Sequence, residues 1–287
     1  MANLKEIRNR ITSIGSTMQI TSAMKMVSAA KLKKAQDAIT AMRPYSSKLT
    51  ELLQNLSATL EGDAGGAYST QREVSKVLLV VITSNRGLCG GFNSSITKTV
   101  VKTVAEKYAD KTVELLTIGK KGKVTLGKTF NVIDSRDDVF DDLTFENVAL
   151  VAEKLMKLYI EGAYDKIEVV YNRFKNAATQ IPQVEQFLPI KPVEGDEVIA
   201  NSDYIFEPSK EEIVLALIPK SLKTQLYKSI RDSFAAEHGA RMTAMHKATD
   251  NATDLRDDLL LTYNKARQAA ITNEILEIVG GAEALKN

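Results

Sequence analysis

Residues 4–18 read LKEIRNRITSIGSTM, and the apolar side chains in this stretch are separated by alternating steps of three and four positions. This spacing places one apolar side chain per turn on a single stripe of an α-helix, which is typical of a coiled-coil seam. The seam is interrupted by polar residues at Thr21, Lys25 and Ser28. It resumes at Leu32, Ala35, Ile39 and Met42. The N-terminal segment is therefore predicted to be one long helix.

The apolar pattern continues past Pro44, at Leu49, Leu52, Leu56 and Leu60. An interior proline removes a helical hydrogen bond and kinks the helix, so a bend is expected at Pro44. A helix over residues 3–60 would be about 85 Å long at about 1.5 Å per residue. A compact domain does not require a helix of that length.

The C-terminal part of the sequence has the same character. After Pro208 a helical pattern runs to about Gly280, interrupted at Pro219 and Gly239. Its apolar positions are Ile213, Leu222, Leu226, Ile230, Phe234, Leu255, Leu259, Ala266 and Leu276. Long helices are stabilised mainly by packing, so the two terminal helices are expected to pair antiparallel. The alternative is two separate helices on a globular body.

The segment between the two helices alternates between strands and helices. Strands are predicted at 76–83, 112–118 and 166–174, and helices at about 94–108 and 145–161. Strands that alternate with helices indicate a parallel α/β sheet. The predicted fold is an antiparallel coiled coil with an inserted Rossmann-like α/β domain. The bounds are 1–61 for the first helix, 74–207 for the α/β domain after a Gly-rich linker at 62–73, and 208–287 for the last helix.

A glycine-rich turn, SNRGLCGGFN at 84–93, follows the first predicted strand. Backbone amides at such a turn can bind phosphate, which makes a nucleotide-binding enzyme the alternative function. The turn lacks both the Lys-Ser/Thr pair of a phosphate loop and the GxGxxG spacing. We interpret Gly87, Gly90 and Gly91 as allowing strand and helix to pack closely, with Cys89 as a small buried residue.

No catalytic, cofactor or metal motif is recognisable, so we expect no enzyme activity and no cofactor. Cys89 is the single cysteine and excludes an internal disulfide. His238 and His246 are interpreted as exposed helix residues without a role. The acidic cluster, interpreted as a solvated loop, consists of Asp137, Asp138, Asp141 and Asp142.

Charge and hydropathy exclude further classes. Residues 1–60 carry 9 Lys/Arg against 3 Asp/Glu, although the whole chain has a net charge of only +2. A basic rod in a nearly neutral chain fits an acidic protein partner better than nucleic acid. No apolar run is long enough to span a membrane, and no signal or transit peptide is expected at the start. Any membrane association is therefore expected to be indirect.

Several segments of the chain carry a family pattern, namely ITNEILEIVGGAEAL (271–285), HGARMTAMHKATDNA (238–252), YNKARQAAIT (263–272), ITSAMKMVSAAKL (20–32), KEIRNRI (5–11) and SNRGLCGGFN. These segments resemble the gamma subunit family of F-type ATP synthases. The resemblance follows the whole chain in order. It implies a non-catalytic rotor shaft inside a ring of three alpha and three beta subunits, with an epsilon subunit and the membrane c-ring as further partners. Proton flow would turn the ring and shaft, and the catalytic chemistry would belong to beta.

The resemblance also implies contact residues. The expected contacts with beta are Met24, Arg241, Arg267, Gln268, Thr272 and Glu277. Lys31, Lys33 and Lys34 are expected to face an acidic collar of the beta subunits. In DYIFEP (203–208), the residues expected to contact the membrane ring are Tyr204, Phe206 and Glu207. The implied location is peripheral, on the cytoplasmic face of the bacterial inner membrane.

One departure from the family pattern is informative. The chain lacks the cysteine-bearing insertion of the chloroplast relatives, so thiol-based regulation is not expected. Besides the nucleotide-binding enzyme, a coiled-coil scaffold without a rotary role stays an alternative.

Overall fold

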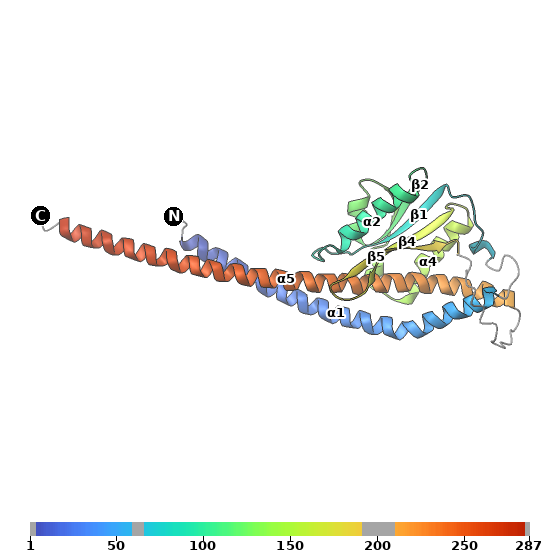
Figure 1. Ribbon diagram of the computed structural model, residues 1–287, viewed down its shortest axis with the longest axis horizontal. Helices are drawn as coiled ribbons and strands as arrows, with labels where there is room; N and C mark the ends of the chain where they lie inside the picture. Colours follow the sequence, from blue (N-terminus) through green and yellow to red (C-terminus); the bar gives the residue numbers. More distant parts are fainter. Residues whose placement is uncertain (1–3, 59–65, 191–209, 285–287) are drawn as a thin grey trace. The chain divides into compact units, whose positions relative to one another are not determined.

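Two long helices occupy the ends of the chain, as predicted. The computed structural model describes residues 4–58, 66–190 and 210–284. Helix α1 spans Leu4–Ala58 and helix α5 spans Lys210–Ala284 (Figure 1). Both helices continue through an interior proline, at Pro44 and Pro219. The ribbon of α1 changes direction in its second half (Figure 1).

The chain divides into two compact units, and each long helix contributes to both. The first, the paired-helix unit, consists of residues 1–28 and 242–287. The second, the globular unit, consists of residues 29–241. The predicted domain bounds at 1–61, 74–207 and 208–287 stay a prediction. What the structure adds is that the first part of α5 belongs to the same compact unit as the sheet.

In the paired-helix unit, α1 and α5 run antiparallel. The Thr21 and Thr249 hydroxyls share a hydrogen bond of 2.8 Å, and the Arg8 guanidinium donates to the Tyr263 hydroxyl at 2.8 Å. The earlier residue on α1 contacts the later residue on α5, so the two helices run in opposite directions. Figure 1 shows the C-terminal end of α5 extending beyond the N-terminal end of α1.

The seam of this pair differs from the prediction in two respects. It is not interrupted at the polar positions, because Thr21 and Ser28 are both buried. It also ends earlier on α5, where Leu255 and Leu276 are 51% and 63% exposed. The prediction that Leu255 and Leu276 pack in the seam was therefore wrong. Beyond the start of α1, the apolar pattern of α5 continues, but its side chains are exposed and no other helix among the described residues of this unit lies beside them.

The globular unit contains a five-stranded sheet in the order β3-β2-β1-β4-β5. Its strands are β1 Lys76–Ile82, β2 Thr112–Ile118, β3 Asn131–Ser135, β4 Lys166–Phe174 and β5 Gln180–Leu188. The first four pair in parallel, and β5 pairs antiparallel with β4. The three predicted strands are confirmed, whereas β3 and the antiparallel edge strand β5 were not predicted.

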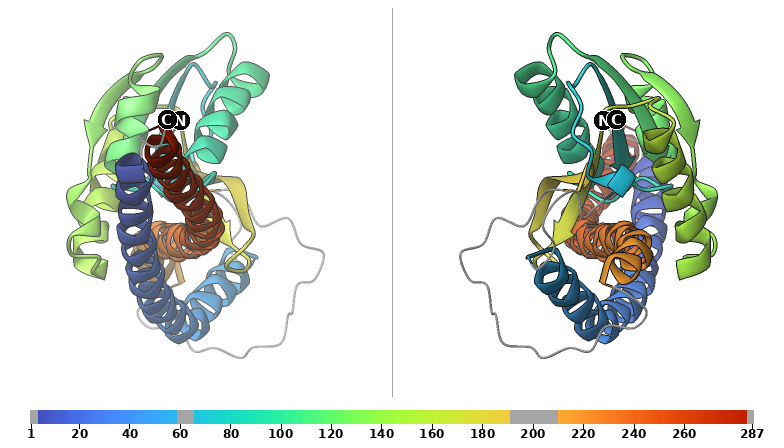
Figure 2. Two further views of the ribbon diagram at one scale, coloured as in Figure 1. Left: turned by 90° about the vertical axis from the view of Figure 1, so that its left-hand side faces the viewer. Right: turned by 90° about the vertical axis from the view of Figure 1, so that its right-hand side faces the viewer.

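Helices cover both faces of the sheet. Between the long helices lie α2 Phe92–Lys107, α3 Lys120–Leu126 and α4 Phe145–Ile160, with short 3-10 turns at Gly66–Tyr68 and Asp138–Phe140. One apolar core joins the sheet to α2 and α3, and the other joins it to α4 and the first part of α5. Figure 2 shows α2 and α4 on opposite sides of the sheet in both end views.

The sequence explains this layering. In β1 every residue from Val77 to Ile82 is fully buried, which suits a central parallel strand covered on both faces. Thr144 is the N-cap of helix α4, and its hydroxyl accepts a hydrogen bond from the Asn147 backbone amide. From α5, Ile218, Leu222, Leu226 and Ile230 enter the core. One side of the sheet is thus closed by the C-terminal helix.

Candidate functional site

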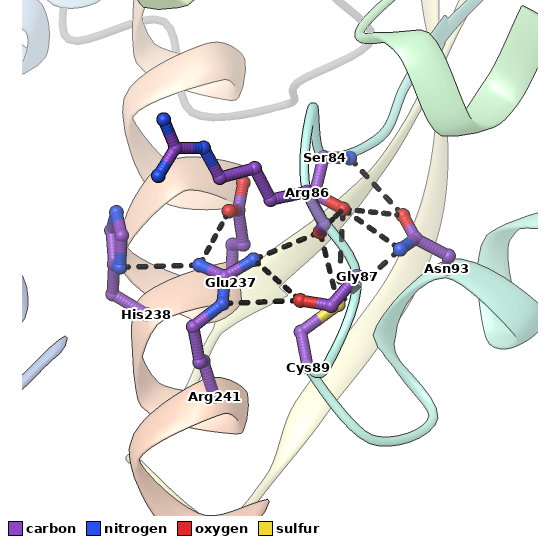
Figure 3. A network of polar contacts seen from close by, with 8 residues as sticks. All are labelled: Ser84, Arg86, Gly87, Cys89, Asn93, Glu237, His238 and Arg241. Carbon is purple, nitrogen blue, oxygen red and sulfur yellow. Dashed lines mark hydrogen bonds and ion pairs between the residues drawn. The ribbon is translucent and has the colours of Figure 1, made fainter. Parts of the chain in front are cut away.

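The loop that follows β1 is cross-linked by its own side chains (Figure 3). The Ser84 amide donates to the Asn93 side-chain oxygen at 3.1 Å, and the Asn93 amide donates to the Ser84 hydroxyl at 2.8 Å. The Ser84 hydroxyl lies 2.7 Å from the Arg86 carbonyl oxygen, to which it can donate. The same Asn93 amide donates to the Cys89 sulfur at 3.3 Å. The two ends of the loop are therefore held together.

The glycines of this loop do not act as the sequence suggested. A Cβ atom added at Gly87 or Gly91 would meet its nearest neighbour at 3.8 Å, which is ordinary contact, so close packing does not require glycine there. Gly90 has φ +56°, a left-handed conformation that favours glycine, and Leu88, two residues earlier, has φ +62°. Glycine is favoured at Gly90 because of its left-handed backbone conformation. The prediction that these glycines allow strand and helix to pack closely was therefore wrong.

Arg241 of α5 binds the same loop from outside (Figure 3). Its Nη2 donates to the Arg86 carbonyl oxygen at 2.9 Å, and its Nε donates to the Gly87 carbonyl oxygen at 3.3 Å. Its Nη1 donates to the Glu237 carboxylate at 2.7 Å and lies 3.4 Å from His238 Nδ1. Because arginine only donates, Nδ1 of His238 acts as the acceptor. The Arg241 side chain is 8% exposed.

Apolar side chains complete the contact between loop and helix. Cys89 and Phe92 pack with Ala236 and Ala240 of α5 in a buried cluster. In doubly wound folds, ligands bind at the carboxyl edge of the sheet, where the strand order reverses. Here α5 packs against the loop at the carboxyl end of β1, and two loop carbonyls accept from its arginine. This arrangement does not support the alternative of a nucleotide-binding enzyme.

Burial controls the titrating groups of this contact. Burial lowers the pKa of His238 to about 3, with smaller contributions from Arg241 and Lys31. Burial also raises the pKa of the Cys89 thiol and of the Glu237 carboxyl, and Arg241 opposes both shifts. His238 is 6% exposed, so the prediction of an exposed histidine was wrong for it. That prediction was right for His246, which is paired at an exposed position with Asp250.

The predicted beta-contact residues fall into two groups. Arg267, Gln268, Thr272 and Glu277 are all exposed on α5, and Met24 is half-buried on α1. Arg241 instead lies buried in the globular unit, where its three guanidinium nitrogens bind groups of this chain. Contact of any of these residues with a beta subunit stays a prediction.

The other predicted contact residues lie elsewhere. Lys31, Lys33 and Lys34 are exposed on α1, and Lys33 forms an i,i+4 ion pair with Asp37 at 3.6 Å. Tyr204, Phe206 and Glu207 lie outside the described residues, so their predicted contact with a membrane ring has no structural description.

The end of α5 carries side chains that the sequence reasoning missed. Large apolar residues there are 48% to 71% exposed, namely Ile271, Ile275, Leu276, Ile278 and Val279. We refer to these five as the apolar tip. Exposed large apolar groups that gather on one element mark an interaction surface. The signal in the sequence was the length difference between the two helices, which leaves the end of α5 without a partner helix.

Neither a metal site nor a membrane span is evident in the part of the chain that the structure describes. No group of three or more His, Cys, Asp or Glu side chains in residues 4–58, 66–190 and 210–284 could hold a metal ion. In the acidic cluster, Asp138 pairs with Arg136 at 2.9 Å and Asp137 with Lys120 at 3.3 Å. No helix in those same ranges is long and apolar enough to cross a bilayer.

Fold and surfaces together define a class of protein in which an α/β unit is inserted between two long, antiparallel terminal helices. Residues 3–285 match the ATP synthase family. The chain is 74% identical over 286 residues to the ATP synthase gamma chain of Flavobacterium psychrophilum, and the alignment covers 100% of both. The chain belongs to the ATP synthase gamma chain family.

Solved structures agree with this assignment. A chain of the Tetrahymena thermophila mitochondrial ATP synthase, in a cryo-EM structure of the central stalk and c-ring, is 25% identical with a TM-score of 0.58. The match covers 80% of this chain and 99% of that one. A chain of the Euglena gracilis mitochondrial ATP synthase rotor shares the fold at 21% identity and a TM-score of 0.67, covering 93% and 98% of the two chains. The family and fold predictions are confirmed, and with them the prediction of a non-catalytic subunit.

Proposed function

We propose that this chain is the central rotor shaft of a proton-translocating F-type ATP synthase. It couples rotation of a membrane c-ring to the conformational cycle of three catalytic beta subunits, which alternate with three alpha subunits. Its membership of the gamma chain family over the whole sequence is the observation that carries this function. The Tetrahymena thermophila relative comes from a structure of a central stalk with its c-ring, which supports the same placement.

The surfaces of the chain suit a shaft that turns inside its partners. A rotor must bind each orientation differently, yet no orientation can be a deep trap. Exposed polar side chains on α5 give many weak contacts, since a surface ion pair contributes about 0–1 kcal/mol. The apolar tip provides a surface on which the end of the shaft can contact the surrounding subunits.

Individual contacts follow from this proposal. Arg267, Gln268, Thr272 and Glu277 of α5 contact beta subunits, together with Met24 of α1. The Arg241 guanidinium is bound within this chain, so Arg241 affects beta only by positioning α5. Lys31, Lys33 and Lys34 face an acidic collar on beta. Tyr204, Phe206 and Glu207 contact the c-ring, and an epsilon subunit is a further partner of the chain. Through the c-ring the chain is peripheral, on the cytoplasmic face of the bacterial inner membrane.

Single-molecule observation of the assembled complex tests the rotary role. The alpha and beta subunits are assembled with this chain, fixed to a surface, and supplied with ATP. The chain should turn in one direction and pause three times per turn, because three catalytic sites act in sequence. A chain that stands still while the ring hydrolyses ATP at the normal rate would refute the proposal.

Charge reversal tests the collar. Lys31→Glu, Lys33→Glu and Lys34→Glu together should reduce coupled ATP synthesis in membrane vesicles while the complex still assembles, because each weak attraction becomes a repulsion. The matched control reverses three exposed lysines of α2, with Lys98→Glu, Lys102→Glu and Lys107→Glu. Equal synthesis rates in the two triple variants would count against the collar.

A further inference from the structure

Glu237 lies next to Arg241, the residue of α5 that is hydrogen-bonded to the loop Ser84–Asn93 (Figure 3). It is 7% exposed, and its carboxylate accepts from Arg241 Nη1 at 2.7 Å. The two residues are separated by one helical turn. A buried carboxylate is costly without a cation beside it, so the pair is stable only as a unit.

The geometry of arginine connects this pair to the loop. The guanidinium is planar, and its donors point in fixed directions. Once Glu237 holds Nη1, the plane of the group is set, and Nε and Nη2 are directed at the carbonyl oxygens of Gly87 and Arg86. A flexible arginine without this partner would have many other rotamers available. Glu237 thus determines where Arg241 points.

The loop needs such support because its backbone is unfavourable. Leu88 is not glycine and yet has φ +62°, and its side chain is 65% exposed. Left-handed backbone at a branched, bulky residue persists only where surrounding contacts impose it. Gly239 allows α5 to approach a second segment closely, because a Cβ there would lie 3.1 Å from the Ala177 Cα in the turn between β4 and β5. Helix α5 therefore holds both segments closely.

We propose that Glu237 is a positioning residue that fixes Arg241 on the loop Ser84–Asn93 and thereby locks α5 to the globular unit against rotation about its own axis. Apolar packing alone is non-directional and resists such rotation poorly, whereas hydrogen bonds have defined directions. Arg241 is the last residue of the globular unit on α5. If the chain is a rotor as proposed, this is the first of the contacts named here to resist torque passing along α5 from the paired-helix unit.

Further directional contacts along α5 place the lock in context. Gln225 donates to the Gln186 carbonyl at 3.2 Å, and Arg231 donates to the Leu143 carbonyl at 2.7 Å. Both lie earlier on the helix than Glu237. Of these three contacts, the one made by Arg241 lies furthest along α5.

Hydrogen exchange of the full chain tests the lock without any partner subunit. In Glu237→Gln, the Ser84 and Phe92 amides should exchange at least about tenfold faster, since these amides report opening of the loop. Amides of β1 should keep the wild-type rate. The matched control, Glu161→Gln, removes an exposed carboxylate from the end of α4 and should change neither region. Unchanged loop exchange in Glu237→Gln, or equal acceleration throughout the unit, would overturn the proposal.

A second variant covers the case in which the single substitution does not fold. Glu237→Gln combined with Arg241→Gln removes both buried charges, so no charge is left without a partner. This chain should fold and still exchange rapidly in the loop. A loop that stays protected in the double variant would overturn the proposal.

The assembled complex tests the mechanical part. The complex reconstituted with Glu237→Gln should move at least about fivefold fewer protons per ATP hydrolysed than the complex with Glu161→Gln. A released loop with normal pumping would overturn the torque assignment. Failure of the rotor function would instead appear as a wild-type chain that does not turn, while the exchange experiment still decides whether the lock exists.

Discussion

The two parts of α5 belong to one continuous helix but have different surroundings. In the globular unit, residues such as Leu226 and Ile230 are fully buried against the sheet and α4. In the paired-helix unit, Met245 and Ala252 are buried, yet Leu255 and Leu261 are more than half exposed. Local helix propensity therefore does not determine which part is held. The first part is fixed by the core of its own chain, and the second part keeps its apolar surface available for other subunits.

The largest expected effect contrasts two leucines of α5. Leu226→Ala should lower the free energy of unfolding by about 2–5 kcal/mol, because it leaves a cavity in the core. Leu261→Ala, at a position 62% exposed, should change it by less than about 0.5 kcal/mol. Urea denaturation followed by circular dichroism measures both. Similar losses in the two variants would break the comparison between the two parts of the helix.

Acid should affect the globular unit through His238. Its pKa is lowered from the ordinary 6.5 to about 3. Between these two pH values His238 is protonated in the unfolded chain but neutral in the folded chain. The stability from neutral His238 is complete above pH 6.5 and is lost as the pH falls toward 3. Between pH 7.5 and pH 5 this residue alone should cost about 2 kcal/mol.

Replacement of each histidine isolates this effect. His238→Gln should show a correspondingly weaker loss of stability on acidification in denaturation experiments at the two pH values. His246→Gln, at an exposed position of the same helix, should behave like the wild type. If His238→Gln keeps the full pH dependence, burial of neutral His238 is not its source.

The smallest effect is expected in the seam of the paired-helix unit. Thr21→Val leaves the Thr249 hydroxyl without its partner on α1 and should cost about 1 kcal/mol. With Thr249→Val added, both hydroxyls are gone and the seam should regain most of that loss. A double-mutant cycle on the unfolding free energy measures the coupling. Strictly additive losses would show that the two threonines act independently.

The sequence predicted what depended on apolar periodicity. The long helices and the strands at residues 76–82, 112–118 and 166–174 are all present. Strand β3 was missed because NVIDS is short and partly exposed at a sheet edge, with little periodicity to detect. Strand β5 was missed because QIPQVEQFL contains a proline and several polar residues, which are tolerated on an edge strand.

The candidate site was less predictable. His238 and Arg241 lie on a helix whose polar residues were expected to face solvent or partner subunits. Arg241 is buried against the loop at 84–93, about 150 positions earlier in the chain, and no local pattern reports such a contact. Likewise, exposure of the apolar tip follows from the position at which α1 begins relative to α5. Tertiary contacts, rather than local propensity, decided both outcomes.

The buried thiol has a practical consequence. Cys89 is the only cysteine of the chain, is 2% exposed, and has a pKa raised by burial. The thiolate is the form that attacks alkylating reagents, so the native protein should react slowly with a maleimide at neutral pH. A cysteine introduced at an exposed position such as Lys128 would then be the dominant attachment point. Fluorophores could be placed at one chosen site while the native thiol stays in position.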